Sequence, residues 1–300
     1  APDWVWVKRR NSTSTHALVD SSRGRAKSLG SESDESEFNT SDTAKDLISF
    51  DTNGFTVGPA NQRNMNGNGD TFVAWQWKAN GGTTTTNDAS STGVGTIDSV
   101  YQANTTAGFS IVTYTGTGSA GTIAHGLGAT PKIYIIKNRE RSDTWRVATE
   151  MMGFGKQLLL NETDQVATDT ATFNNTAPTS TVFSVGTRNA VNASSEGHVA
   201  YCFAEKQGYS KFGSYTGNGN ADGAFVYTGF KPAWLMVKRT ADAARAWVIH
   251  DNKQDPHNPT ANRLDANTNE VNQSSGHFDF LSNGFKCRST EGATNAASHY

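Results

Sequence analysis

The chain has 300 residues, a formal net charge of −2 and 29 glycines against 7 prolines. This length suits two or three compact units that bury a core without disulfide staples, and the charge gives no electrostatic basis for binding nucleic acid. No apolar run approaches the roughly 20 residues that span a bilayer, and no signal-peptide pattern is present, so membrane insertion is not expected.

A proline-led apolar run recurs three times along the chain. The copies start at Pro2, Pro131 and Pro232, and they read PDWVWVK, PKIYIIK and PAWLMVK. Proline can open a strand without costing a ladder hydrogen bond, so each run predicts a β-strand. Apolar residues fall on both faces of each run, which indicates a strand covered on both sides. One cover is expected to be the unit's own second sheet, and the other a neighbouring unit or another subunit.

Shorter landmarks keep the same order around these strands. A Tyr-Thr-Gly turn precedes the second and third copies, and Phe50–Phe55 matches Phe280–Phe285 as an Asn-Gly hairpin. Aromatic closing strands are expected at 70–77 and 197–203. Helical spacing is nowhere convincing, because the nearest candidate, Met151–Leu160, is interrupted by two glycines.

Three repeated units therefore fit the sequence. The first covers 1–79 and lacks an opening hairpin, the second covers 107–207, and the third covers 208–300 and lacks a closing strand. The Gly-, Thr- and Ser-rich stretch 80–106 is interpreted as a linker or extended arm. Short strands separated by tight turns predict an all-β chain of tandem β-sandwich or jelly-roll-like units, with the terminal units incomplete.

Two patterns resemble ligand-binding motifs, and a plain turn is the favoured interpretation of each. Gly116, Gly118 and Gly121 match a dinucleotide-binding spacing, but the residues that follow predict a strand rather than the helix that would meet a pyrophosphate. The stretch Asn218–Gly223 resembles the start of a calcium loop but lacks the closing glutamate, and Asn66–Asp70 receives the same interpretation. No cofactor and no metal are expected.

The remaining reactive side chains are scattered. Cys202 and Cys287 lie in apolar strand-like runs, which is typical of small buried thiols, although a disulfide between them stays open. The seven histidines form no metal-binding spacing. The acidic run 32–37 is typical of a solvated loop rather than of a cation site. No catalytic residue is assigned.

Two tryptophans occupy matching positions after the second and third proline-led strands. Trp145 and Trp247 correspond to His16 in the first unit. An exposed tryptophan can stack on a sugar, so both are candidate glycan contacts, but packing in the core is the favoured alternative.

Several stretches resemble a repeat domain of marine tailed phages. They are Thr106–Gly116 followed by His125–Gly128 and Pro131, then Gly213–Gly219, and Asp279–Lys286. That family occurs in phage structural proteins, often described as tail-fibre-like, in which tandem units make up much of a long chain. The resemblance covers nearly the whole sequence and implies a β-sandwich virion protein with no established catalytic site to carry over.

The sequence and the resemblance together lead us to expect a non-enzymatic structural protein of a phage virion, assembled in the host cytoplasm. A tail-fibre or tail-tip component that forms homo-oligomers, contacts other virion proteins and meets the host surface is the first interpretation. A head decoration or head fibre protein is the second. A glycan-binding or polysaccharide-depolymerising adhesin module, acting on host surface glycan, is the third.

Overall fold

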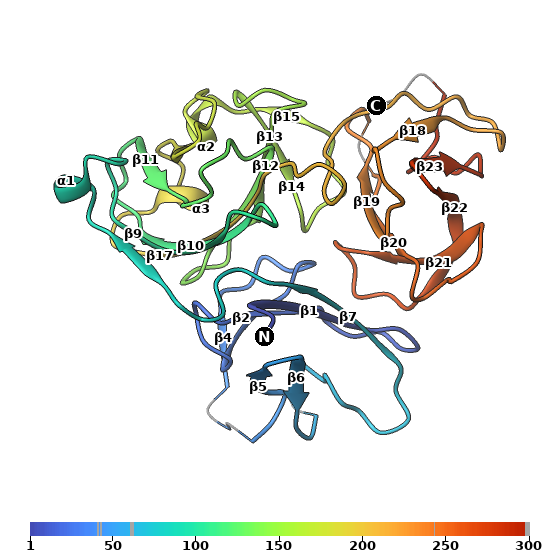
Figure 1. The fold of residues 1–300 in the computed structure, drawn as a ribbon, viewed down its shortest axis with the longest axis horizontal. Helices are drawn as coiled ribbons and strands as arrows, with labels where there is room; N and C mark the ends of the chain where they lie inside the picture. The colour runs from blue at the N-terminus through green and yellow to red at the C-terminus, as the bar shows by residue number, and fades with distance from the viewer. Residues whose placement is uncertain (41, 43, 61–62, 243, 298–300) are drawn as a thin grey trace.

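The computed structural model describes residues 1–40, 42, 44–60, 63–242 and 244–297. Strands make up 38% of the chain and helices 4%, which confirms the predicted all-β class. The strands form three larger antiparallel sheets, and Figure 1 shows that these sheets surround a common centre. Each sheet contains one of the three proline-led strands.

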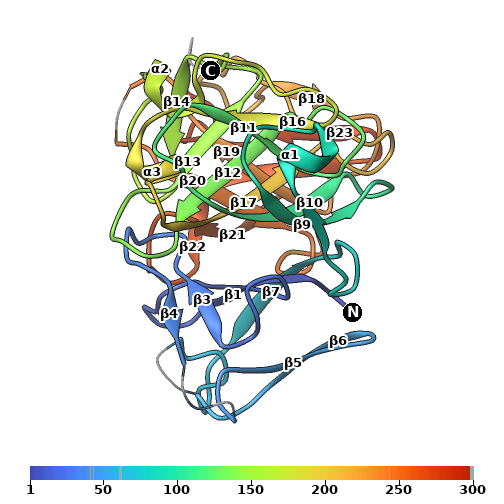
Figure 2. The same ribbon diagram turned by 90° about the vertical axis from the view of Figure 1, so that its left-hand side faces the viewer.

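The first unit pairs a five-stranded sheet, in the order β4-β3-β2-β1-β7, with the separate hairpin β5-β6. Its strands are β1 (Trp4–Arg9), β2 (Ala17–Asp20), β3 (Lys27–Leu29), β4 (Phe38–Asn39), β5 (Leu47–Asp51), β6 (Gly54–Val57) and β7 (Phe72–Trp77). In Figure 2 the hairpin lies on the side of this sheet that faces away from the other units. Val5 and Val7 of β1 form one apolar cluster with Leu47 of the hairpin.

The second unit contains the largest sheet, in the order β15-β14-β13-β12-β17-β10-β9-β8, and the small sheet β11-β16. Its strands are β8 (Thr85–Asn87), β9 (Ser99–Asn104), β10 (Phe109–Thr115), β11 (Gly121–Ala124), β12 (Ile133–Asn138), β13 (Arg146–Thr149), β14 (Lys156–Leu159), β15 (Ala167–Thr168), β16 (Val182–Val185) and β17 (Gly197–Phe203). Its helices are single turns: α1 (Ala89–Thr92), α2 (Thr170–Phe173) and α3 (Asn189–Asn192).

The interpretation of residues 80–106 as a linker is wrong. Within this stretch, β9 pairs with β10 along its whole length, and β8 pairs with β9. Between them, Asp88 caps α1 by accepting hydrogen bonds from the backbone of Ser90 and Ser91, and Gly93 ends the helix at a φ of 67°. The small polar residues that suggested a flexible arm therefore serve as edge-strand, capping and turn residues.

The third unit has one sheet in the order β18-β23-β22-β21-β20-β19. Its strands are β18 (Phe225–Tyr227), β19 (Trp234–Lys238), β20 (Trp247–Asp251), β21 (Thr260–Asp265), β22 (Gln273–Leu281) and β23 (Gly284–Cys287). Gly284 follows the tight turn between β22 and β23, and Phe280 pairs with Phe285 across it, as the Asn-Gly signal predicted.

The proline-led strands β1, β12 and β19 send alternate side chains toward the centre of the molecule. These inward side chains join one cluster shared by the three units, and they are Trp4, Trp6, Ile133, Ile135, Trp234 and Met236. The side chains between them, such as Val5, Tyr134 and Leu235, pack inside their own unit. The prediction of strands covered on both faces is confirmed, and the second cover is a neighbouring unit of the same chain.

Aromatic contacts hold the shared cluster together across unit boundaries. The ring of Trp4 stacks on that of Tyr201 in the second unit, with centroids 4.2 Å apart and planes 14° apart. Trp77 of the first unit meets Trp234 of the third edge to face, with centroids 5.8 Å apart. Such pairs add about 0.5–1.5 kcal/mol each beyond the burial of the rings. The three units therefore share one core.

The two motif-like patterns form turns. A Cβ atom on Gly116 would lie 2.2 Å from the carbonyl oxygen of Ala193, so the backbones approach too closely there for any other residue. The Oδ1 atom of Asn218 accepts from the backbone of Asn220 at 3.0 Å, and Oδ1 of Asn220 accepts from Asp222 at 2.9 Å. These are the Asx turns that the sequence favoured over a calcium loop.

Candidate functional site

The three units meet along three seams, and each seam repeats the same backbone hydrogen bonds. The first set runs from Asp143 N to Asp34 O at 2.8 Å, from Arg245 N to Thr163 O at 3.2 Å, and from Ser14 N to Asn269 O at 2.9 Å. The second set runs from Glu37 N to Arg139 O at 2.8 Å, from Val166 N to Thr240 O at 3.0 Å, and from Asn272 N to Arg10 O at 2.8 Å. Unit two thus joins unit one, unit three joins unit two, and unit one joins unit three, which closes a ring.

The two candidate glycan contacts lie within these seams. Trp145 is 0% exposed and donates from Nε1 to the carbonyl oxygen of Gly30 in the first unit at 2.8 Å. Trp247 is 4% exposed and donates in the same way to Leu159 of the second unit at 2.8 Å. Neither ring offers a face to solvent, so the glycan hypothesis for these residues is wrong and the core alternative holds.

His16 occupies the same place at the third seam. Its Nε2 atom lies 3.0 Å from the carbonyl oxygen of Thr268 in the third unit, and the side chain is fully buried. Its Nδ1 atom accepts a hydrogen bond of 2.8 Å from the indole of Trp6. At this seam the imidazole of His16 contacts a backbone carbonyl group of the neighbouring unit. At the other two seams the indole of a tryptophan makes the corresponding hydrogen bond.

We expect Trp145→Phe to lower the free energy of unfolding by about 1–3 kcal/mol more than Trp4→Phe does. Both replacements remove the same ring volume from the core, but only the first leaves the carbonyl group of Gly30 buried without its donor. Trp4 is a matched control because its Nε1 atom is buried without a partner in the described part of the chain. Urea unfolding of the two variants measures the difference, and equal losses would contradict the role of the seam hydrogen bond.

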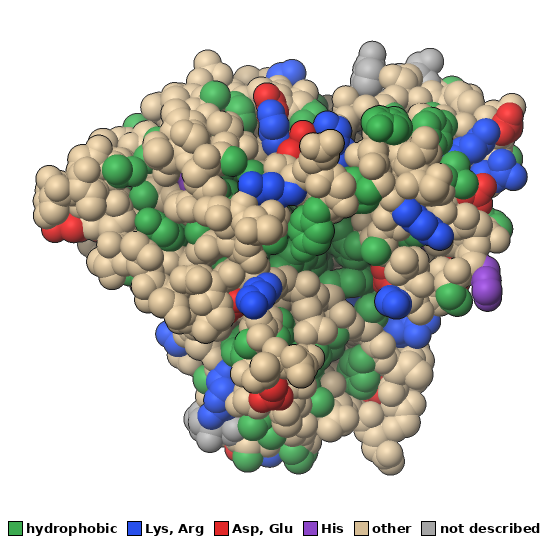
Figure 3. Space-filling view, in the orientation of Figure 1, with side chains coloured by type: hydrophobic (Ala, Val, Ile, Leu, Met, Phe, Trp, Pro, Cys, Tyr) green, Lys and Arg blue, Asp and Glu red, His purple; other side chains and the backbone are tan. Residues whose placement is uncertain are grey.

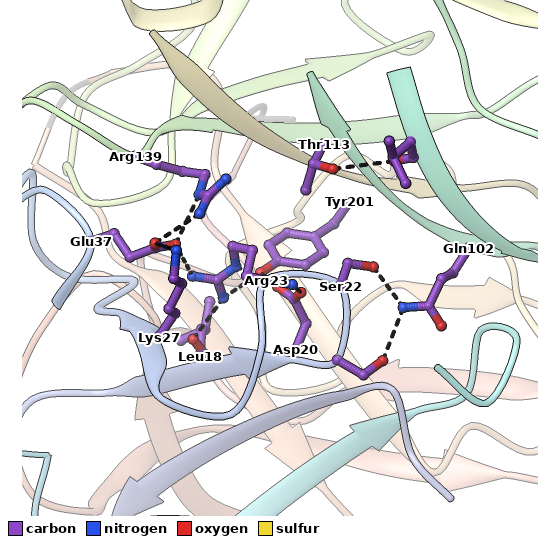
Figure 4. Close-up of polar contacts among 12 residues, drawn as sticks. Leu18, Asp20, Ser22, Arg23, Lys27, Glu37, Gln102, Thr113, Arg139 and Tyr201 are labelled. Carbon is purple, nitrogen blue, oxygen red and sulfur yellow. Dashed lines mark hydrogen bonds and ion pairs between the residues drawn. The ribbon is translucent and has the colours of Figure 1, made fainter. Parts of the chain in front are cut away.

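A buried ionic cluster fills the seam between the first two units, and Figure 4 shows its members pointing toward one another. Arg23 lies at its centre, with Nε 2.5 Å from Asp20 Oδ2 and Nη1 3.0 Å from Glu37 Oε2. Its Nη2 atom donates to the hydroxyl of Tyr201 at 3.0 Å, and that hydroxyl donates to Asp20 at 2.7 Å. Arg139 adds two hydrogen bonds of 2.9 Å to Glu37 from outside the cluster.

Electrostatics keep the cluster charged despite its burial. Burial disfavours the charged guanidinium of Arg23, but Asp20, Tyr201 and Glu37 outweigh this effect and raise its pKa above the ordinary value. Burial likewise opposes the charge on Glu37, yet hydrogen bonds from Arg139 and attraction to Arg23 lower its pKa. The interpretation of residues 32–37 as a solvated loop is therefore wrong at Glu37, whose carboxylate binds two units together.

A second pair of contacts links closing strands to the neighbouring unit. Tyr201 of β17 donates to Asp20 of the first unit, and Trp75 of β7 donates from Nε1 to Asp251 of the third unit at 3.0 Å. Tyr201 and Trp75 hold equivalent positions, because they pair with Ile135 and Trp6 in the proline-led strands. Alignment of the repeats predicts that Tyr201 and Trp75 are equivalent. It does not predict that each side chain donates a hydrogen bond to a carboxylate of the neighbouring unit.

The lysine that closes each proline-led run lies near a seam, and it is buried in the first two units and half-buried in the third. Nζ of Lys8 donates to Asn269 O of the third unit at 3.2 Å, and Nζ of Lys238 donates to Thr163 O of the second unit at 3.0 Å. Lys137 donates within its own unit, to Asn138 O at 2.8 Å. Desolvation lowers the pKa of each lysine to about 8.

The second unit also has a surface cleft of about 690 Å³. Its lining includes hydroxyl side chains from β9 and β10, together with Arg139, Glu140 and Gly197. Among the residues that the structure describes, no three His, Cys, Asp or Glu side chains gather as metal ligands, and no helix is long and apolar enough to cross a membrane. Cys202 and Cys287 are both buried free thiols.

The arrangement is suited to holding three units in fixed positions. Backbone hydrogen bonds, buried indoles and the Arg23 cluster all lie between units, and each satisfies groups that would otherwise be buried without partners. Sequence reasoning identified Trp145 and Trp247 as equivalent but missed Asp20, Arg23 and Tyr201, since ionic partners from separate units have no fixed spacing along the chain.

Comparison with known proteins places the whole chain in one family. No curated protein matches it. No solved structure matches it either. A family model described as "Domain of unknown function (DUF7483)" matches residues 1–300, so the chain belongs to that family.

Proposed function

We propose that this chain is a structural component of a tailed-phage particle, and specifically a module of a tail fibre or tail tip. The observation that carries the proposal is the closed ring of three β units, joined by equivalent backbone hydrogen bonds at every seam. Such a ring keeps its units in fixed relative positions without a ligand. The phage setting rests on the resemblance of stretches such as Thr106–Gly116 and Asp279–Lys286 to the phage repeat domain.

The surfaces on the outside of the ring indicate where partner proteins can bind. The apolar faces of β1 and β12 are buried within the chain and those of β19 are half-buried, so the ring forms without a second copy to cover β1 and β12. We therefore propose that contacts with other virion proteins, and any association between copies, use the outer surfaces and the open sheet edges. Burial of Trp145 and Trp247 removes the residues on which a glycan-binding role rested.

Purified phage particles provide the test. Antibodies raised against residues 1–300 are applied to intact particles with gold labelling, and the same particles are analysed by protein mass spectrometry. We expect the protein in the purified particles and the label at the tail. Label confined to the head would favour a head decoration or head fibre protein instead, and protein present in the infected-cell lysate but absent from particles would overturn the virion proposal.

A further inference from the structure

The strand β19 has one open edge. In the other units the equivalent strand is central: β1 pairs with β2 and β7, and β12 pairs with β13 and β17. In the described residues β19 pairs only with β20. The exposure of the strands follows from this, because β1 and β12 are buried at five of six residues and β19 is half-buried at all five.

The open edge offers unpaired backbone groups. Asn252 N donates to Ala233 O at 2.9 Å, which places the hydrogen-bonding groups of Leu235 and Val237 on the β20 side. Backbone groups alternate in direction along an antiparallel strand, so those of Trp234 and Met236 face the empty side. The side chains of Trp234 and Met236 at the same time border the shared core. An added strand would gain both ladder hydrogen bonds and apolar contacts.

In the residues that the structure describes, the seam between the second and third units lacks a contact that the other two seams have. Tyr201 of β17 reaches Asp20, and Trp75 of β7 reaches Asp251. The register places Thr149 at the corresponding position of the second unit. In the described chain, no aromatic donor from the third unit faces Thr149. The described part of the third unit has no strand equivalent to β7 or β17, which carry this donor in the other two units. Figure 3 shows hydrophobic side chains lining a hollow where the units meet.

The third unit contains the same turn that precedes the closing strand β17 in the second unit. In the second unit the turn before β17 is fixed by Asn192, whose Oδ1 accepts from Thr117 N at 2.8 Å. In the third unit Asn295 takes the same place and accepts from Asn218 N at 3.1 Å. Gly118 and Gly219 donate to the carbonyl oxygens of these asparagines at 2.9 and 2.8 Å. The described part of the third unit therefore has the loop contacts that precede a closing strand, but no closing strand follows them within residues 208–242 and 244–297.

We propose that the open edge of β19 binds one antiparallel β-strand with the pattern Val-Ala-aromatic-x-aromatic, donated by a polypeptide segment outside these 300 residues. This pattern is shared by β7, which contains VAWQW, and by β17, which contains VAYCF. A second copy of the chain is not the donor, because its own β7 and β17 are already paired with β1 and β12. The proposal is independent of the virion role, since it depends only on the sheet edge.

A peptide with the sequence of residues 196–204, carrying C202S, is the probe. Labelled with fluorescein and titrated with the 300-residue protein, it is expected to bind with a rise in anisotropy and to raise the Tm as its concentration increases. The peptide variant Y201A is expected to bind about tenfold more weakly or worse, because it loses the aromatic group directed at the seam between the second and third units.

Two isomeric peptides provide the matched control. Arg139 N donates to Gly197 O at 2.9 Å, so Val199 and Tyr201 also form hydrogen-bonded pairs with the proline-led strand. N-methylation at Val199 and Tyr201 is therefore expected to abolish binding, whereas N-methylation at Ala200 and residue 202 leaves binding measurable. Equal binding by the two isomers, or no anisotropy change at protein concentrations up to about 1 mM, would overturn the proposal. Self-association of the protein that the peptide reverses would assign the edge to a second copy and overturn the proposal as well.

Discussion

Replacing Arg23 with methionine is expected to lower the free energy of unfolding by about 3–5 kcal/mol. The guanidinium is 0% exposed and contacts the carboxylates of Asp20 and Glu37 at 2.5 and 3.0 Å. Removing it leaves two buried carboxylates without their shared cation, and methionine supplies apolar volume but no hydrogen bond. The loss is expected to be larger than for any surface pair, because the desolvation of those carboxylates is no longer compensated.

Arg139→Met is the matched control. Arg139 contacts the same Glu37 carboxylate at 2.9 Å, but its side chain is 20% exposed and solvent replaces part of its contribution. We expect a loss of about 1 kcal/mol or less. Urea unfolding of both variants measures the difference, and the double variant Asp20→Asn with Arg23→Met should recover part of the loss. Similar losses of stability for the two arginine variants would show that burial does not increase the contribution of Arg23 over that of the partly exposed Arg139.

Local pattern was enough to predict much of this architecture. The alternation of PDWVWVK, PKIYIIK and PAWLMVK predicted strands covered on both faces, and the structure confirms both covers. Asn-Gly signals predicted hairpins at Gly54 and Gly284, where the chain turns tightly between paired strands. These features depend on side-chain period and turn chemistry, which act over a few residues and are visible in the sequence.

The seams were harder to predict because they depend on which units touch. Trp145 and Trp247 occupy equivalent positions in the repeats, but the sequence pattern is the same for an exposed and for a buried tryptophan. Their burial between units could therefore not be predicted. The stretch 80–106 was mistaken for a linker because threonine-rich edge strands carry no apolar alternation. Glu37 was mistaken for a solvated residue because its partner Arg139 lies about a hundred residues further along the chain.

Acid is expected to unfold the protein between about pH 6.5 and pH 4, through histidines that are held neutral. Nδ1 of His16 accepts from Trp6 at 2.8 Å while Nε2 faces Thr268 O at 3.0 Å. Nδ1 of His125 accepts from the backbone of Leu127 at 3.2 Å, and its Nε2 faces a carbonyl oxygen at 3.2 Å. A proton on Nδ1 would place two donors face to face at either site.

The direction of the pH effect follows from burial. Desolvation lowers the pKa of His16 to about 3 and that of His125 to about 4, while an unfolded histidine titrates near 6.5. The unfolded chain therefore binds more protons than the folded one below pH 6.5, so stability is complete above that pH and falls as the pH drops. Each histidine is expected to contribute roughly 3 kcal/mol to the loss by about pH 4.

His16→Asn isolates the contribution of one seam. Asparagine offers an oxygen to Trp6 and an N–H to Thr268 but does not titrate, so the variant is expected to lose roughly 3 kcal/mol less than the wild type between pH 7 and pH 4. Glu32 acts in the opposite direction, because burial raises its pKa and protonation favours the folded form, but it is present in both proteins. Urea unfolding at the two pH values measures this difference. Parallel losses in both proteins would mean that His16 takes up its proton at the same pH in the folded protein as in the unfolded chain, and that burial does not hold the imidazole neutral.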